Sequence, residues 1–282
     1  MRRVLGIDVG GTKIAIGVSG TDGPEIAARV RLETGENPLA TALRAARGLD
    51  RAPAAVGFST CGVISDGRVA LAPNVPGWNG LELPRLLREE YGTIPVAIGN
   101  DVKAAAAAEL RWGALRGVST GVYLNLGTGL AAALVVGGQV VTGAHGAAGE
   151  IGYLLADPGE PAFADGHAPL EERFSGGALV ARGSALLGRT VPAGALFALP
   201  EAAGLVDAAL TPLAMAVANL CVVLDPERVV VGGGMMAEQA SILPHLAREM
   251  RRVVPFPPEL RAARFTDDAP LLGALALAHA LT

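Results

Sequence analysis

The sequence is poor in several features on which large classes of proteins depend. Only two of its 282 residues are cysteines, Cys61 and Cys221, and their positions show no pairing pattern. This scarcity excludes a disulfide framework and a thiolate metal cluster, and it favours a reducing, cytoplasmic location. Lysine and arginine form no cluster, and the net charge is -4. The electrostatic footprint of a nucleic-acid-binding protein is therefore absent.

Long uninterrupted apolar stretches are lacking as well. Glycine follows Val229-Val230-Val231 at once, and the apolar stretch that ends in Val222-Val223-Leu224 contains Asn219. Neither stretch is predicted to span a bilayer, and we expect no membrane partner. The apolar run at the amino end is interrupted by Asp8, and no cleavage site follows it, which argues against a signal peptide.

Apolar residues are what the chain has in abundance, at 51% of the total, and they are enough to bury a large core. Strand-like and helix-like segments alternate, which predicts an α/β fold with mixed sheets. The expected strands cover residues 4–7, 14–18, 25–32, 54–59, 95–99, 121–126, 130–136 and 228–231. The expected helices cover residues 38–49, 83–91, a segment built on the alanines at 104–108, 237–252 and 270–281.

Two similar halves are expected within this chain. A strand, a glycine turn and a second strand open the sequence, and the same layout returns at residues 121–136. We place the boundary near Glu109 and expect the final helix to pack back on the first half. The predicted domains are a smaller lobe of residues 1–109 with 270–282 and a larger lobe of residues 110–269.

A glycine hairpin with an acid at its mouth follows the first strand, in the order Asp8-Val9-Gly10-Gly11-Thr12-Lys13. Adjacent glycines permit positive φ and leave room for an anion, so the amides of Gly10, Gly11 and Thr12 are candidate phosphate ligands. Asp8 is placed to hold Mg²⁺ through water. An ordinary glycine hairpin with a polar edge explains the segment equally well.

Two later glycine segments suit a nucleotide in the same way. Gly127-Thr128-Gly129 forms either a second phosphate nest or a plain β-turn. Gly232-Gly233-Gly234, between a strand and a helix, lets a flat ring such as adenine approach the backbone. The spacing G-x-G-x-x-G is missing there, which disfavours a dinucleotide-binding fold.

Three segments are candidates for binding the substrate that accepts the phosphate. Asn100-Asp101 stands at a predicted helix start, where both residues are common caps, and the helix N-terminus is expected to keep Asp101 ionised and ready to accept a hydroxyl proton. Glu150 follows a loop of small residues and is either a site residue or part of a solvated turn. Trp78 offers a stacking face for a sugar ring or simply packs in its loop.

The chain resembles the ROK family of sugar kinases and related repressors, within the actin-like ATPase superfamily. The resemblance covers nearly the whole chain and depends on five segments in a fixed order, at residues 8–13, 100–101, 126–129, 149–152 and 231–234. It implies a two-lobed actin-like ATPase (ribonuclease H-like) fold with a cleft between the lobes. It also implies ATP and Mg²⁺ as cofactors, a sugar as partner, and a homodimer or homotetramer.

By this resemblance, residues 8–13 and 127–129 bind the phosphates of the nucleotide and residues 232–234 bind its adenosine, while Asp101 is the general base. The positions assigned to the sugar are Gly62, Asn74, Asn100, Asp101, Glu150 and Glu171, with Tyr153 where the family has a histidine beside the sugar.

The sequence departs from the family in two places. Gly129 is followed by Leu130 and three alanines in place of further glycines. The ligands of the family's structural zinc are replaced by Tyr153, Ala162, Ala164 and Pro169. We therefore predict no zinc, because these side chains offer no ligand. A site rebuilt from Asp157, Asp165 and His167 is the alternative. Without the metal, we expect the loop to be held by Pro158, Pro161 and Pro169, with Phe163 or Phe174 packed beneath.

The expected activity is an ATP-dependent kinase of glucokinase type that transfers the γ-phosphate to the 6-hydroxyl of glucose. The alternatives are mannose, fructose, allose, N-acetylmannosamine or N-acetylglucosamine as acceptor, polyphosphate as donor, or a sugar-binding protein that has lost catalysis. A sugar-responsive repressor would need a DNA-binding domain before the kinase fold, whereas the hairpin begins at residue 4.

Overall fold

The computed structural model describes residues 3–20, 23–72 and 75–282, which fall into two compact units. The first unit comprises Met1–Arg116, Val140–Ala148 and Asp267–Thr282. The second unit comprises Gly117–Gln139 and Gly149–Thr266. The boundary expected near Glu109 falls within a helix that continues to Trp112, so the chain passes to the second unit only after that helix has ended.

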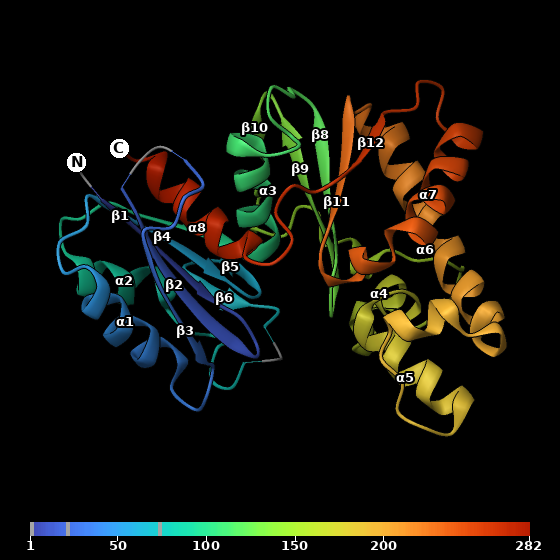
Figure 1. Cartoon of the computed structure of the whole chain (residues 1–282), viewed down its shortest axis with the longest axis horizontal. Coiled ribbons are helices and arrows are strands. Elements are labelled where there is room, and N and C mark those ends of the chain that lie inside the picture. The colour runs from blue at the N-terminus through green and yellow to red at the C-terminus, as the bar shows by residue number, and fades with distance from the viewer. Residues whose placement is uncertain (1–2, 21–22, 73–74) are drawn as a thin grey trace. The chain divides into compact units, whose positions relative to one another are not determined.

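The first unit is built on a mixed sheet of five strands in the order β3-β2-β1-β4-β7 (Figure 1). The strands are β1 (Val4–Val9), β2 (Lys13–Ser19), β3 (Ala28–Glu33), β4 (Ala55–Thr60) and β7 (Val96–Asn100). β1 pairs with β2 in antiparallel orientation and with β4 in parallel orientation. A small hairpin of β5 (Val63–Ser65) and β6 (Arg68–Ala70), which the sequence did not predict, follows β4.

Four helices cover this sheet, namely α1 (Pro38–Leu49), α2 (Leu83–Tyr91), α3 (Asp101–Trp112) and α8 (Ala269–His279). Leu5 and Ile7 of β1 share a core with buried residues of α1 and α2, whereas a Cβ on Gly6 would lie 2.8 Å from Leu275 of α8. Because side chains alternate along a strand, Asp8 points to the same face as Gly6. This is the face on which α8 packs, with α3 against it (Figure 1).

The second unit repeats the same plan with a sheet in the order β10-β9-β8-β11-β12. The strands of this sheet are β8 (Gly121–Leu126), β9 (Leu130–Val136), β10 (Gln139–Val140), β11 (Arg228–Gly232) and β12 (Glu259–Ala262). The boundary of the unit falls within β10, after Gln139. β8 is antiparallel to β9 and parallel to β11, as β1 is to β2 and β4. The predicted α/β class with mixed sheets is confirmed.

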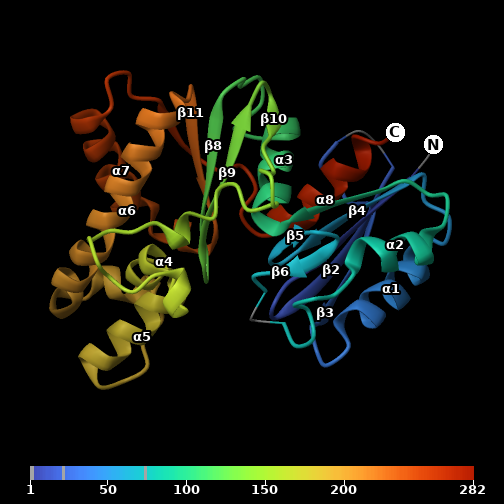
Figure 2. The ribbon, with the colours of Figure 1, turned by 180° about the vertical axis from the view of Figure 1, so that it is seen from behind.

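The helices of the second unit are α4 (Pro169–Arg173), α5 (Gly176–Leu187), α6 (Ala203–Leu224) and α7 (Gln239–Val253). Single turns of 3₁₀ helix lie at η1 (Ile151–Tyr153), η2 (Phe163–Asp165), η3 (Gly194–Ala198), η4 (Pro200–Ala202) and η5 (Gly234–Glu238). α6 and α7 lie against one face of the sheet (Figure 2), where their apolar residues share a core with Val122, Leu124 and Val229.

One segment of the described residues, Pro200–Leu224, is long and apolar enough to cross a membrane by length and composition alone. It contains η4 and α6, and 56% of its most apolar window is buried. Leu210, Leu213 and Val217 of α6 belong to the core of the second unit, and a core helix commonly passes the same test. The absence of a membrane partner and the cytoplasmic location therefore stay predictions.

Candidate functional site

Asp8 is a buried carboxylate near the end of β1, only 4% exposed. Ser59 stands beside it in the parallel register of β1 and β4 and donates its hydroxyl to Asp8 Oδ1 at 2.8 Å. Burial raises the pKa of Asp8 to about 7, although the hydrogen bond from Ser59 lowers it, and the nearby charge of Asp101 raises it further. A cation beside Asp8 would offset this cost of burial, so the residue fits the predicted Mg²⁺ site.

Asp101 is the first residue of α3, and Asn100 is the cap of that helix. Asn100 Oδ1 accepts a hydrogen bond from the Lys103 amide at 2.8 Å, and Asp101 Oδ1 accepts one from the Val102 amide at 2.9 Å. We expected the helix N-terminus to lower the pKa of Asp101, but the pKa is raised. Desolvation raises the pKa of Asp101 and outweighs the backbone hydrogen bonds and Lys103, which lower it.

The first glycine turn is closed by its own backbone. The Gly10 amide donates to the Lys13 carbonyl at 3.0 Å, and the Thr34 hydroxyl donates to the Gly10 carbonyl at 2.7 Å. The Gly10 amide is therefore used inside the hairpin, whereas the sequence suggested that it faces a phosphate, and Gly10 does not adopt a positive φ. Gly11 and Thr12 are exposed at the tip and stay candidate phosphate ligands.

The loop after β4 carries further residues that were assigned to the sugar. Asn74 lies outside the described residues. Gly62 has a φ of +74°, and a Cβ there would lie 2.4 Å from the Ala70 carbonyl oxygen, so the β5–β6 hairpin itself requires this glycine. Trp78 offers no stacking face, because its ring is 2% exposed in the core and its Nε1 donates to Thr60 Oγ1 at 2.7 Å.

The second glycine turn joins β8 to β9 and lies against the amino end of α5. The Gly127 amide donates to the Gly129 carbonyl at 3.1 Å. The amides of Gly176 and Gly177, the first residues of α5, donate to the carbonyls of Gly127 at 2.8 Å and Thr128 at 3.0 Å. Two backbone hydrogen bonds from the amino end of α5 therefore hold this turn.

Three residues predicted to bind the sugar gather around this turn in the second unit. Glu171 Oε2 accepts a hydrogen bond from the Leu130 amide at 2.7 Å, directly after the turn. Tyr153 is half-buried, and burial raises its pKa, as do the charges of Glu150 and Glu171. Glu150 precedes η1 and has no side-chain capping bond to it. The structure thus places Tyr153 within electrostatic range of both Glu150 and Glu171.

Two of the three glycines assigned to adenosine are required by the packing of the strand itself. A Cβ on Gly232 would lie 2.3 Å from the Tyr123 hydroxyl, and Gly233 has a φ of +93° with no room beside the Leu126 carbonyl. A Cβ on Gly234 would meet nothing within 4 Å. Strand packing therefore explains Gly232 and Gly233, and Gly234 has the open space that a planar ring would need.

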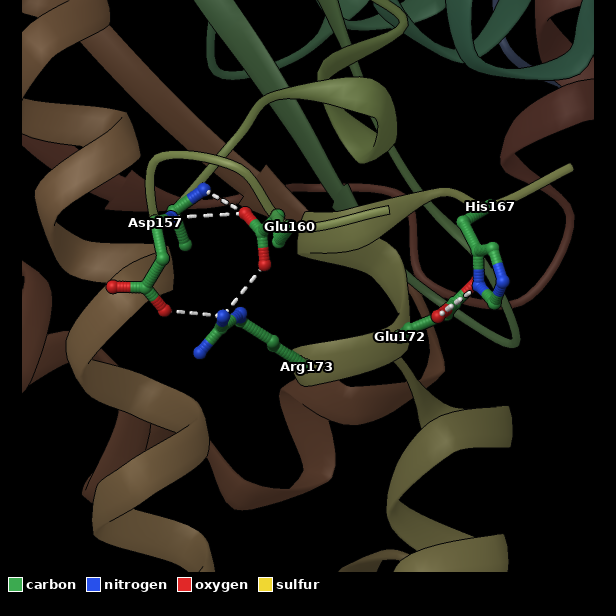
Figure 3. A network of polar contacts seen from close by, with 6 residues as sticks. Asp157, Glu160, His167, Glu172 and Arg173 are labelled. Atoms are coloured by element: carbon green, nitrogen blue, oxygen red, sulfur yellow. Dashed lines mark hydrogen bonds and ion pairs between the residues drawn. The ribbon is translucent and has the colours of Figure 1, made fainter. Parts of the chain in front are cut away.

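An ion-pair network that the sequence analysis missed ties the loop between η1 and α4 (Figure 3). Arg173 bridges Asp157 and Glu160, and the Glu160 carboxylate also accepts hydrogen bonds from the amides of Ala156 and Asp157. His167 Nδ1 lies 3.0 Å from both carboxylate oxygens of Glu172. The sequence did contain a signal, because Arg173 is the only arginine in a segment rich in acidic residues. The spacing along the chain did not show which of these acids it would contact.

The same loop holds the positions at which the resemblance predicts lost zinc ligands. Among the residues that the structure describes, no group of three or more His, Cys, Asp or Glu side chains is arranged to hold a metal ion. Phe174 is buried, as proposed for the packing beneath the loop. Phe163 is 62% exposed and instead meets the Tyr153 ring edge to face at 5.3 Å.

The sequence model that describes the ROK family matches residues 4–281 of this chain. An N-acetylmannosamine kinase from Shigella boydii is 35% identical over 292 residues, which cover 98% of this chain and 98% of that protein.

Two solved structures are similar over their full length. A ROK hexokinase from Thermus thermophilus has a TM-score of 0.86 at 33% identity, with 99% of this chain and 98% of that chain covered. A ROK family glucokinase from Streptomyces griseus, solved in complex with glucose and AMPPNP, has a TM-score of 0.80 at 27% identity, with 99% of each chain covered.

Proposed function

This chain belongs to the ROK family, and from that membership we propose that it is a sugar kinase that uses ATP. The observation that carries the proposal is the pair of carboxylates, Asp8 and Asp101, within electrostatic range of each other in the first unit. Phosphoryl transfer needs one group that holds the nucleotide's cation and another that receives the acceptor's proton. Asp8 and Asp101 are proposed for these two roles.

Asp101 is the proposed general base. Its carboxylate would orient the sugar hydroxyl and take its proton while the hydroxyl oxygen bonds to the γ-phosphorus and the bond to the β-phosphate oxygen breaks, so that ADP leaves. The raised pKa of Asp101 suits this role, because a carboxylate deprived of solvent binds a proton more readily than a solvated one. The hydrogen bond from the Val102 amide holds Oδ1 in place.

Asp8 is proposed to hold Mg²⁺ through water, and the ion would neutralise charge on the nucleotide phosphates. Gly11 and Thr12 at the first turn, and Thr128 and Gly129 at the second, are the proposed contacts to the phosphates. Adenosine is assigned to Gly234 and its neighbours, where the backbone is open.

The residues proposed to bind the sugar are those assigned by the family resemblance, Asn100, Asp101, Glu150, Tyr153 and Glu171. Carboxylates accept hydrogen bonds from neighbouring hydroxyls, which suits a polyol. Gly62 and Asn74 stay assigned to the same ligand by the family resemblance alone.

Glucose, phosphorylated at its 6-hydroxyl, is the first proposed acceptor. It is supported by the relatives named hexokinase and glucokinase, the second of which was solved with glucose. N-acetylmannosamine is the second candidate, because the relative at 35% identity carries that name. The two sugars differ at carbon 2, where one has a hydroxyl and the other an acetamido group.

Sugar-dependent ADP release decides between these candidates. Purified protein with Mg-ATP would be assayed against glucose, mannose, fructose, allose, N-acetylmannosamine and N-acetylglucosamine. Polyphosphate would be tested as a second donor by measuring sugar phosphate, because transfer from polyphosphate releases no ADP. We expect the highest kcat/KM with glucose. A higher value with N-acetylmannosamine would replace glucose by the second candidate, and no ADP release with any sugar would overturn the proposed activity.

A further inference from the structure

The Glu171 carboxylate contacts the protein at the second glycine turn as well as carrying the sugar role proposed above. Its Oε2 accepts the hydrogen bond from the Leu130 amide at 2.7 Å, at the first residue of β9. The contact is close, since a Cβ on Gly129 would lie only 2.7 Å from the same oxygen. One carboxylate oxygen of Glu171 is thus engaged with the turn.

The helix that carries Glu171 has little stability of its own. α4 contains five residues, and isolated helices of that length do not persist in water. Its inner side is anchored by Leu170 and Phe174, each 1% exposed in the core of the second unit. Tertiary contacts must therefore set the orientation of α4, and with it the position of the Glu171 carboxylate.

The outer side of α4 is anchored by Arg173, two residues after Glu171. Its guanidinium bridges Asp157 and Glu160, at 2.6 Å from Glu160 Oε2, and Figure 3 shows both partners turned toward it. Arg182 of α5 donates to the Arg173 carbonyl at 2.7 Å. We call the set Asp157, Glu160 and Arg173 the clamp. A planar guanidinium held by two carboxylates restrains both the position and the rotation of its helix.

We propose that Glu171 is a positioning residue for the turn at Gly127–Gly129, and that the clamp fixes α4 so that this carboxylate stays on the Leu130 amide. The inference rests on the proposed function for its consequence, because the turn is the proposed second phosphate site. Glu171 thereby links sugar binding to the nucleotide: one oxygen orders the turn while the other is available to a sugar hydroxyl.

The hydrogen bond from the Leu130 amide to Glu171 is tested by amide hydrogen exchange. NMR measures the exchange rate of Leu130 in Glu171→Ala and in Glu171→Gln without ligand. We expect exchange to accelerate about tenfold in the alanine variant, as for the loss of one charge-assisted hydrogen bond. The glutamine variant should stay within about threefold of the parent, because its amide oxygen accepts the same bond. Val230 of β11 serves as the internal reference, since a general loss of stability would accelerate both amides.

The clamp is tested by Arg173→Gln, with Arg252→Gln as the matched control. Arg252 pairs with Glu249 on α7 of the same unit, away from the clamp. We expect Leu130 exchange to rise at least about threefold in the clamp variant and to stay unchanged in the control, with Val230 constant in both. In the kinase assay the clamp variant should raise KM for ATP more than it lowers kcat.

Unchanged Leu130 exchange in Glu171→Ala would overturn the positioning role of Glu171. Unchanged Leu130 exchange in Arg173→Gln would overturn the role of the clamp. Neither result depends on activity. A protein that phosphorylates no sugar would therefore remove the proposed function and still leave the exchange result interpretable.

Discussion

Two carboxylates of the first unit, Asp8 and Asp101, have raised pKa values. Two carboxylates of the second unit have lowered pKa values, and they belong to the segment from Asp157 to Arg173, called the clamp loop here, at Glu160 and Glu172. Burial raises the pKa of Asp8 to about 7 and raises that of Asp101 as well. The hydrogen bond from Arg173 lowers the pKa of Glu160 to about 2, and His167 lowers that of Glu172. Asp8 and Asp101 are held away from water, whereas Glu160 and Glu172 are paired with Arg173 and His167 near the surface.

This contrast separates two uses of the same functional group. A buried carboxylate with a raised pKa accepts a proton or a metal ion readily, but its charge destabilises the folded protein. A paired carboxylate is a poor base, but its charge stabilises the loop that it ties. The chemistry is therefore expected in the first unit, and the clamp loop is expected to act on position alone.

The largest expected effect comes from exchanging Asp for Asn in the two regions. Asp101→Asn removes the proposed base and should lower kcat by about two orders of magnitude or more. Asp157→Asn removes an exposed clamp charge and should change kcat by less than about threefold. Steady-state ADP release on folded protein measures both. Equal losses in the two variants would erase the contrast between the regions.

The second effect concerns stability, and its sign follows from the raised pKa of Asp8. Between the unfolded value near 4 and the folded value of about 7, the folded state binds more protons, so stability falls as pH rises. Asp8→Asn removes this burden. In the presence of a chelator it should be more stable than the parent at pH 8, by on the order of a few kcal/mol, and equal to it below about pH 4.

Urea unfolding of both proteins across this pH range measures the difference. The matched control is Asp66→Asn, at an exposed position in the β5–β6 turn with a φ of +49°, which asparagine tolerates. That control should leave the free energy of unfolding within about 0.5 kcal/mol of the parent, as is usual for an exposed position. A parent protein more stable than Asp8→Asn at pH 8 without Mg²⁺ would contradict the sign.

Local signals explain how much of the fold was predictable. α1 and α2 match their predicted limits, since proline lies in the first turn of both and the residues after them, Asp50 and Gly92, leave the helical conformation. α3 begins where Asn100 caps the alanine-rich segment. The β5–β6 hairpin was missed because three-residue strands carry almost no periodic signal.

Contacts between distant residues explain what the sequence could not predict at the site. The Ser59 hydrogen bond to Asp8 depends on the parallel register of strands 51 residues apart. The pKa of Asp101 depends on tertiary burial, which outweighed the local effect of the helix N-terminus. Trp78 was expected either to stack on a sugar ring or to pack in its loop, and its ring is in the core. The motifs identified which residues matter, but their environments required the fold.

The smallest expected effect is on the thermal stability that the lowered pKa of Glu160 contributes. The pKa of Glu160 is about 2 in the folded protein and near 4 in the unfolded chain, so its stabilising effect is present above pH 4 and is lost as pH falls through 2. Glu160→Gln should therefore lower the melting temperature at pH 7 and converge with the parent as the pH approaches 2, which is opposite to the behaviour of Asp8→Asn. Thermal melts over this range, with Glu201→Gln in the exposed η4 turn as control, measure the effect. A glutamine variant as stable as the parent at pH 7 would mean that the clamp leaves the stability of the second unit unchanged.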